Sequence, residues 1–232
     1  ARDTIKMLYV RGLKMESKPF AIGVRIQHKQ DVINNQYGKF KDVLPNASYK
    51  LTYQTKASRG VYTFCMCPGG YVVNSSSEVG KLIVNGMSNY ERDTENANSA
   101  VVVTVGKEDF GPNPLDGLEY QRTIEGNAFR KGNGKIPVQL LGDYVKNTIS
   151  TEFKEVKPIF KGDYSFANLN EIFPYYINDA IKEYFQYLRV EKGVSEETIK
   201  SYAYDLKQFF MSLNNRRKLF RKLQRKYLLN TV

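Results

Sequence analysis

Cysteine, histidine and tryptophan are scarce in this sequence, and the scarcity limits the chemistry of the chain. The 232 residues include two cysteines, one histidine and no tryptophan. A structural zinc site takes about four nitrogen, sulfur or carboxylate ligands, and two thiols with one imidazole fall short of that set. We therefore expect no metal site.

Long apolar runs are also missing. No run approaches the roughly 18 residues of a membrane-spanning helix, and no signal peptide opens the sequence. We expect a cytoplasmic protein without membrane insertion. The net charge of +11 favours contact with a polyanion, without specifying which one.

The two cysteines lie one residue apart in YTFCMCPGGYVV, residues 62–73. Side chains alternate along a strand, so regular geometry places Cys65 and Cys67 on the same face, where a disulfide would strain the backbone. The pattern favours two small buried apolar side chains, with redox chemistry as the alternative. In the turn that follows, Pro68 ends the ladder, and Gly69 and Gly70 let a flat or charged group approach the backbone, unless they form a plain turn between strands.

The spacing of apolar residues predicts an α+β fold with an antiparallel-rich sheet and flanking helices. Residues 20–28 alternate cleanly, and His28 ends that strand as a structural residue. Turn residues separate the expected strands, which are 20–28, 49–53, 61–67, 81–85 and 99–105. Helices are expected over 5–9, ending at Gly12, and over 113–132, with Asn113 as cap and Pro114 in the first turn.

From Pro174 onward the pattern becomes helical. Apolar residues at helical spacing predict a first helix that ends at Gly193 and a second that Ser195 caps, forming a helical hairpin. A basic helix follows, with no acidic residue after Asp205. Such a dense basic run favours nucleic-acid contact, and a solvated surface helix is the alternative. The expected domains are 1–170 and 174–232.

Seven segments carry a resemblance to a known family. In chain order they are ARDT, KPFAIGVRIQH, YTFCMCPGGYVV, NGMSNYERD, NANSAVVVTV, PVQLLGDY and FANLNEIFP. With them, residues 1 to about 180 resemble a family of bacterial FAD-dependent dehydrogenases, in which a substrate-side domain is inserted into a dinucleotide-binding domain. The resemblance implies FAD as cofactor and places the Pro-Gly-Gly turn near the flavin, without naming a catalytic residue. The cofactor-binding residues it implies are Cys67, Pro68, Gly69, Gly70, Asn85, Gly86 and Met87.

The chain departs from this family in its phosphate-binding motif. No G-x-G-x-x-G occurs, and we expect the pyrophosphate-binding strand and helix to precede Ala1 and the closing flavin segment to follow residue 180. FAD is therefore not expected to be retained by this chain. We interpret residues 1–170 as a truncated middle domain.

Residues 177–213 resemble the N-terminal core-binding domain of tyrosine recombinases and phage integrases. The segment that carries this resemblance begins with INDAIKEYFQYLRVEKGVSEETIKSYAYDLKQFF. The resemblance implies DNA as a partner. Recombination itself is not expected, because His28 is the single histidine and no residues remain for a catalytic domain. The expected DNA-binding residues are Lys200, Ser201, Tyr204, Arg216, Arg217, Lys218, Arg221, Lys222, Arg225 and Lys226.

Three hypotheses follow from these patterns: a piece of a flavoenzyme, a DNA-binding module of the integrase type, and a fusion product without activity of its own. We expect a chain descended from both families that catalyses nothing alone. The sequence leaves its substrate, its DNA sequence preference and its oligomeric state open.

Overall fold

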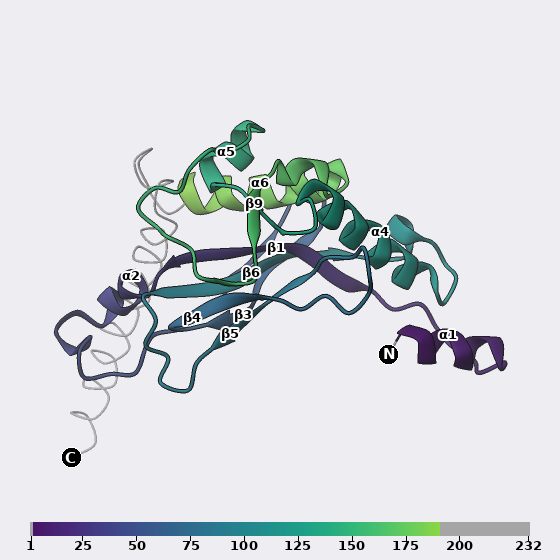
Figure 1. Ribbon diagram of the computed structural model, residues 1–232, viewed down its shortest axis with the longest axis horizontal. Coiled ribbons are helices and arrows are strands. Elements are labelled where there is room, and N and C mark those ends of the chain that lie inside the picture. Colours follow the sequence, from purple (N-terminus) through teal and green to yellow (C-terminus); the bar gives the residue numbers. More distant parts are fainter. Residues whose placement is uncertain (1, 191–232) are drawn as a thin grey trace, which may run out of the picture.

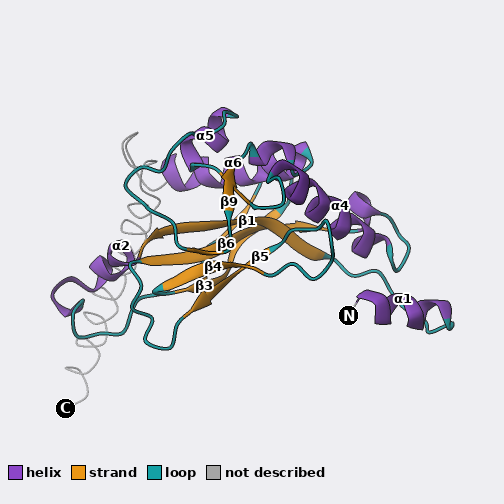
Figure 2. Cartoon of the chain, viewed as in Figure 1, coloured by secondary structure: helices purple, strands orange, loops and turns teal. Residues whose placement is uncertain are grey.

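The computed structural model describes residues 2–190, which form an α+β fold of antiparallel-rich sheets and flanking helices (Figures 1 and 2). The helices are α1 (Arg2–Val10), α2 (Gln30–Asn34), α3 (Lys107–Phe110), α4 (Asp116–Lys131), α5 (Leu141–Lys146) and α6 (Tyr175–Val190), with 3₁₀ turns η1 (Asn35–Phe40) and η2 (Leu169–Glu171). The strands are β1 (Phe20–Lys29), β2 (Thr52–Gln54), β3 (Gly60–Cys67), β4 (Gly70–Asn74), β5 (Val84–Ser88), β6 (Asn96–Val105), β7 (Ile136–Val138), β8 (Phe160–Lys161) and β9 (Tyr164–Phe166). The predicted fold class is confirmed.

The largest sheet has the strand order β1-β6-β3-β2, and all of its pairs are antiparallel. Strands β1 and β6 pair over their full length, from Phe20 opposite Val105 to Lys29 opposite Asn96. The β-branched valines of β6 suit such a central strand. Strand β1 pairs with another strand on one side only, and the cavity described below lies along its other edge.

Two smaller sheets complete the framework. Strand β4 pairs antiparallel with β5 and parallel with β8, and β7 pairs parallel with β9. Figure 1 shows α4, α5 and α6 on one side of β1 and β6, with β4 and β5 on the other. Helix α4 also reaches the segment that enters β5, because Ile124 of α4 packs with Leu82 and Val84.

Helix α6 covers one face of the large sheet and forms the main core with it. Ile177, Ile181 and Tyr184 are fully buried against a cluster that includes Val101 and Val103 of β6. The apolar residues that predicted this helix are the ones that it buries. The described part of α6 therefore packs as part of the sheet domain, and the predicted boundary between residues 170 and 174 stays a prediction.

Helix α1 lies at the periphery and contributes no buried residue (Figure 1). Arg2 attaches it to the rest of the domain through ion pairs with Glu125 of α4 and with Glu78. The helix ends where Gly12 adopts a positive φ of 83°, as the glycine at this position predicted.

Several predicted boundaries differ from the structure. The strands expected at 49–53 and 81–85 begin three residues later, at Thr52 and Val84. Asn113 does not cap α4, because its backbone and side-chain amides donate to the Asp116 carboxylate and the helix begins at that aspartate. The Gly193–Ser195 connection and the second predicted helix lie outside the described residues.

Candidate ligand-binding site

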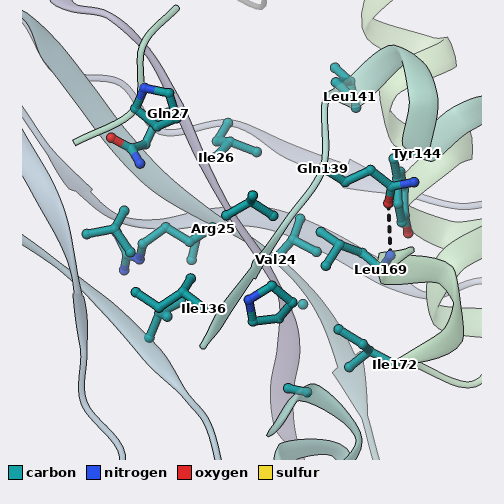
Figure 3. Close-up of a pocket in the computed structure, with 18 of the residues that line it drawn as sticks. Val24, Arg25, Ile26, Gln27, Ile136, Gln139, Leu141, Tyr144, Leu169 and Ile172 are labelled. Atoms are coloured by element: carbon teal, nitrogen blue, oxygen red, sulfur yellow. Dashed lines mark hydrogen bonds between the residues drawn. The ribbon is translucent and has the colours of Figure 1, made fainter. Parts of the chain in front are cut away.

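A cavity of about 980 Å³ lies along the free edge of β1. Figure 3 shows Val24, Ile26 and Leu141 among its lining residues, which come from both faces of β1, from α4 and from the segment that enters α5. The segments at 82–84 and 153–160 complete the wall. Most of the lining is aliphatic, which is typical of a pocket for an organic ligand.

Two glutamine side chains that line this cavity are hydrogen-bonded to the backbone of the domain. The Gln139 Oε1 atom accepts the Leu169 N–H at 2.9 Å, drawn as a dashed line in Figure 3. The Gln27 Oε1 atom accepts the Ile159 N–H at 2.9 Å. These glutamines hold the segments at Ile159 and Leu169 against the cavity wall.

His28 also lines the cavity and is buried. The His28 Nδ1 atom lies 3.2 Å from the Lys29 carbonyl oxygen, which can only accept, so Nδ1 carries the proton and Nε2 accepts from the Tyr49 hydroxyl at 2.8 Å. Burial lowers the pKa of His28 to about 4, although the Lys29 carbonyl works against that shift. The imidazole is therefore neutral near pH 7 and structural, as its place at the strand end predicted.

The structure brings together the two segments that were predicted to bind a cofactor. Residues 67–70 run from the end of β3 into β4, and residues 85–87 lie in the neighbouring strand β5. Val72 of β4 lies opposite Gly86, and Tyr71 lies opposite Met87. The predicted residues therefore form one continuous patch, and their role in binding stays a prediction.

Within this patch, the space beside each glycine is filled by the chain itself. A Cβ atom at Gly69 would collide with the Arg92 carbonyl, and one at Gly70 with the Met87 carbonyl. At Gly86, the Arg25 guanidinium and the Asn98 side chain occupy the same position. These glycines are needed for close packing within the domain. This agrees with the alternative stated above, in which Gly69 and Gly70 form a plain turn between strands.

The cysteines do not follow regular strand alternation. The pairing of β3 with β6 shifts between Phe64 and Cys67, and Cys65 adopts a positive φ of 51° within that irregularity. Cys65 is exposed, whereas Cys67 is buried. The prediction that both are buried is wrong for Cys65, because a β-bulge turns its side chain out of the regular pleat.

Arg25 connects the bulge to the cavity, and sequence analysis missed it. Its Nη1 atom donates to the Cys65 carbonyl at 3.2 Å and to Asn98 Oδ1 at 2.7 Å, and its Nη2 atom donates to Asn85 Oδ1 at 3.3 Å. Arg25 also lines the cavity. The local signal for this role is a charged residue on the face of β1 opposite Val24 and Ile26.

The described residues do not fit the pyrophosphate of FAD. Such a group needs a glycine-rich loop that leads into a helix N-terminus, where backbone N–H groups and the helix dipole meet its charge. Helix α4 instead carries Asp116 and Glu119 in its first turn, which repel phosphate. The space beside Gly69, Gly70 and Gly86 is filled by the chain itself, so the predicted cofactor patch offers no phosphate cradle either.

Three further expectations concern metals, membranes and DNA. Among residues 2–190, no group of three or more His, Cys, Asp or Glu side chains is placed to hold a metal ion. In the same part of the chain, no helix has both the length and the apolar character needed to cross a membrane. All the predicted DNA-binding residues, from Lys200 to Lys226, lie outside the described residues.

Comparison with known proteins gives two family matches. Residues 19–200 match the model described as "FAD-dependent protein, C-terminal domain-like". Residues 181–230 match the model of the phage integrase N-terminal SAM-like domain. Both resemblances drawn from the sequence are confirmed, and residues 181–200 belong to both matches.

A relative is found in Clostridium beijerinckii, under the name "Uncharacterized protein". It is 53% identical over 190 residues, which make up 79% of this chain and 36% of the relative. The chain therefore spans little more than a third of the relative's length.

Proposed function

The chain belongs to the family of FAD-dependent proteins with this C-terminal-like domain, and from that premise we propose that residues 2–190 form the ligand-side domain of an FAD-dependent oxidoreductase. The observation that carries the proposal is the largely aliphatic cavity of about 980 Å³ beside β1. A cavity of this size holds most of a drug-sized organic molecule. In this proposal the domain binds and shields the organic substrate.

FAD itself is held by segments other than residues 2–190, because the described residues offer no fit for its pyrophosphate. The longer relative has room for such segments, since the matched part is 36% of its length. We therefore propose that the chain catalyses no oxidation or reduction alone. No residue is assigned a catalytic role.

Three measurements on the purified chain test this function. The visible spectrum and titration with FAD are expected to show no stoichiometric flavin. An environment-sensitive apolar dye is expected to bind and fluoresce, because the cavity is largely lined by apolar side chains. Stoichiometric yellow cofactor in the purified protein would contradict the first part of the proposal.

A matched pair of variants locates the dye. Val102→Phe adds an aromatic ring inside the cavity and should weaken dye binding, whereas Val79→Phe adds the same ring at a fully exposed position outside it. If both variants bind the dye like the wild type, the cavity is not the ligand site.

The integrase-like match favours a second function, DNA binding by residues 181–230. We propose that the basic residues from Arg216 to Lys226 contact phosphates, and that Lys200, Ser201 and Tyr204 contribute from the preceding segment. If about 5 of the basic residues touch phosphates, log K should fall with log salt at a slope near −4.5. Most of this affinity should be independent of DNA sequence, because phosphate contacts position the protein and base contacts specify.

The test compares duplex binding against salt for the intact chain and for a form that ends at Asn215. Removing the basic run should reduce both the affinity and the slope. Unchanged values would mean that the run is a solvated surface segment. Recombination is not proposed, since the single histidine, His28, is buried against Tyr49 in the sheet domain.

A further inference from the structure

The bulge in β3 gives the two cysteines of the chain an unusual arrangement. Phe64 and Cys67 are three positions apart, while their partners on β6, Ala100 and Asn98, are two positions apart. One extra residue is therefore accommodated, and Cys65 adopts the left-handed backbone conformation there, with φ at 51°. A non-glycine residue in this conformation is uncommon and concentrates at functional sites.

The bulge folds Cys67 back toward Cys65. The Cys67 Sγ atom donates to the Cys65 carbonyl oxygen at 3.3 Å. Burial raises the pKa of the Cys67 thiol, nearby Arg25 works against that shift, and an interaction with the Cys65 side chain adds to it. The Cys67 thiol thus lies against the Cys65 backbone, although regular strand geometry would make a bond between the two sulfur atoms strained.

The two sulfur atoms differ in access to solvent. Cys65 is exposed, and the adjacent Phe64 is 63% exposed, so a small oxidant reaches Cys65 freely. Cys67 is buried. This is the arrangement of an accessible thiol with a second thiol placed to react with its oxidised form.

We propose that Cys65 and Cys67 form a peroxide-sensitive redox site that closes to an intramolecular disulfide. The Cys65 thiolate attacks one oxygen of hydrogen peroxide, the O–O bond breaks, and hydroxide leaves to give Cys65 sulfenic acid. The Cys67 thiolate then attacks the Cys65 sulfur, the S–O bond breaks, and a second hydroxide leaves. The two thiol protons neutralise the two hydroxides, so that two thiols and one peroxide give one disulfide and two waters.

A disulfide across one intervening residue is strained, and strained disulfides are easily reduced again. The site therefore acts reversibly. Closing it removes the thiol proton that Cys67 donates to the Cys65 carbonyl, and that carbonyl is also the acceptor for Arg25 at the cavity wall. The proposal does not depend on FAD or on the oxidoreductase function.

Limited hydrogen peroxide added to the purified full chain tests the site, with thiol-specific alkylation and peptide mass analysis as readouts. Both thiols are expected to disappear together. The peptide containing them should lose the mass of two hydrogen atoms, and dithiothreitol should restore both thiols. Alkylation distinguishes this change from oxidation of Met66, which lies between the cysteines.

Two variants separate the steps. In Cys67→Ser, Cys65 sulfenic acid should accumulate and be trapped by dimedone, whereas wild type should show little trapping. Cys65→Ser should leave the buried Cys67 thiol unreacted. Three results would each overturn the proposal: a disulfide-linked dimer through Cys65, sulfinic acid at Cys65 beside a free Cys67 in wild type, and no reaction at either thiol.

Discussion

The two sides of strand β6 are built differently. Val101, Val103 and Val105 alternate along one side and are fully buried in the core with α6. Ala100 and Val102, on the opposite side, are partly buried and line the cavity beside β1. The same short stretch of sequence therefore supplies both a tightly buried core face and a wall of the cavity.

We therefore expect the two sides of β6 to have different roles, one in the stability of the fold and the other in ligand binding. Interiors packed to the density of the α6 side respond strongly to the loss or gain of a methylene group. A cavity offers few contacts to its lining residues, so their substitution affects ligands more than folding. The β1 edge can therefore serve a ligand because the α6 side maintains the fold.

The largest difference is expected from truncating isoleucine on each side. Ile181→Ala in α6 leaves a hole in the core and should lower the free energy of unfolding by about 3–4 kcal/mol. Ile83→Ala at the cavity wall, where the side chain is 46% exposed, should change it by less than about 1 kcal/mol. Urea unfolding measures both, and equal losses would contradict the contrast.

His28 lies where the two parts meet and should give a pH-dependent stability. The pKa of its imidazole is about 4 in the fold against an ordinary 6.5, so the unfolded chain binds the proton more readily. The contribution is complete above pH 6.5 and is lost as pH falls toward 4, and it amounts to about 3 kcal/mol.

The control for this effect is His28→Gln, which removes the titrating group and keeps an acceptor for Tyr49. Because His28 is the single histidine, the difference in pH dependence between the two proteins isolates it. Parallel curves of unfolding free energy against pH would show that His28 does not titrate as described.

Gly86→Ala tests the packing between the bulge and the cavity. The added Cβ atom would collide with Asn98 Oδ1 and the Arg25 guanidinium, and relieving that overlap should cost about 2 kcal/mol. Gly142→Ala is the matched control, since a Cβ atom there meets nothing within 4 Å. Thermal unfolding compares them, and equal midpoints would mean that Arg25 is free to move away.

Much of the framework could be predicted from sequence, because β1 and α6 each show their burial in the local periodicity. The clean alternation of 20–28 and the helical spacing after Pro174 both reflect contact with one core. The cavity could not be predicted, since its walls come from segments between Phe20 and Phe185 that meet only in the fold. The bulge at Cys65 likewise depends on pairing with β6, and the residues 62–67 alone fit a regular strand equally well.

The smallest change in the free energy of unfolding is expected when Val102 and Val103 are each replaced by leucine. These neighbours on β6 have the same side chain and backbone environment but point to opposite sides. Val103→Leu adds a methylene group to a site with no exposed surface, and overpacking there should cost about 1–2 kcal/mol.

Val102→Leu adds the same group at the cavity wall, where there is room for it and new contacts form. Its free energy of unfolding should stay within about 0.5 kcal/mol of wild type or rise slightly. Both variants make the same valine-to-leucine change in β6, so their strand propensities change equally. The difference between their free energies of unfolding, measured in urea, therefore reports the space available on each side of β6. A cost at Val102 as large as that at Val103 would mean that the cavity beside β1 is closed in solution.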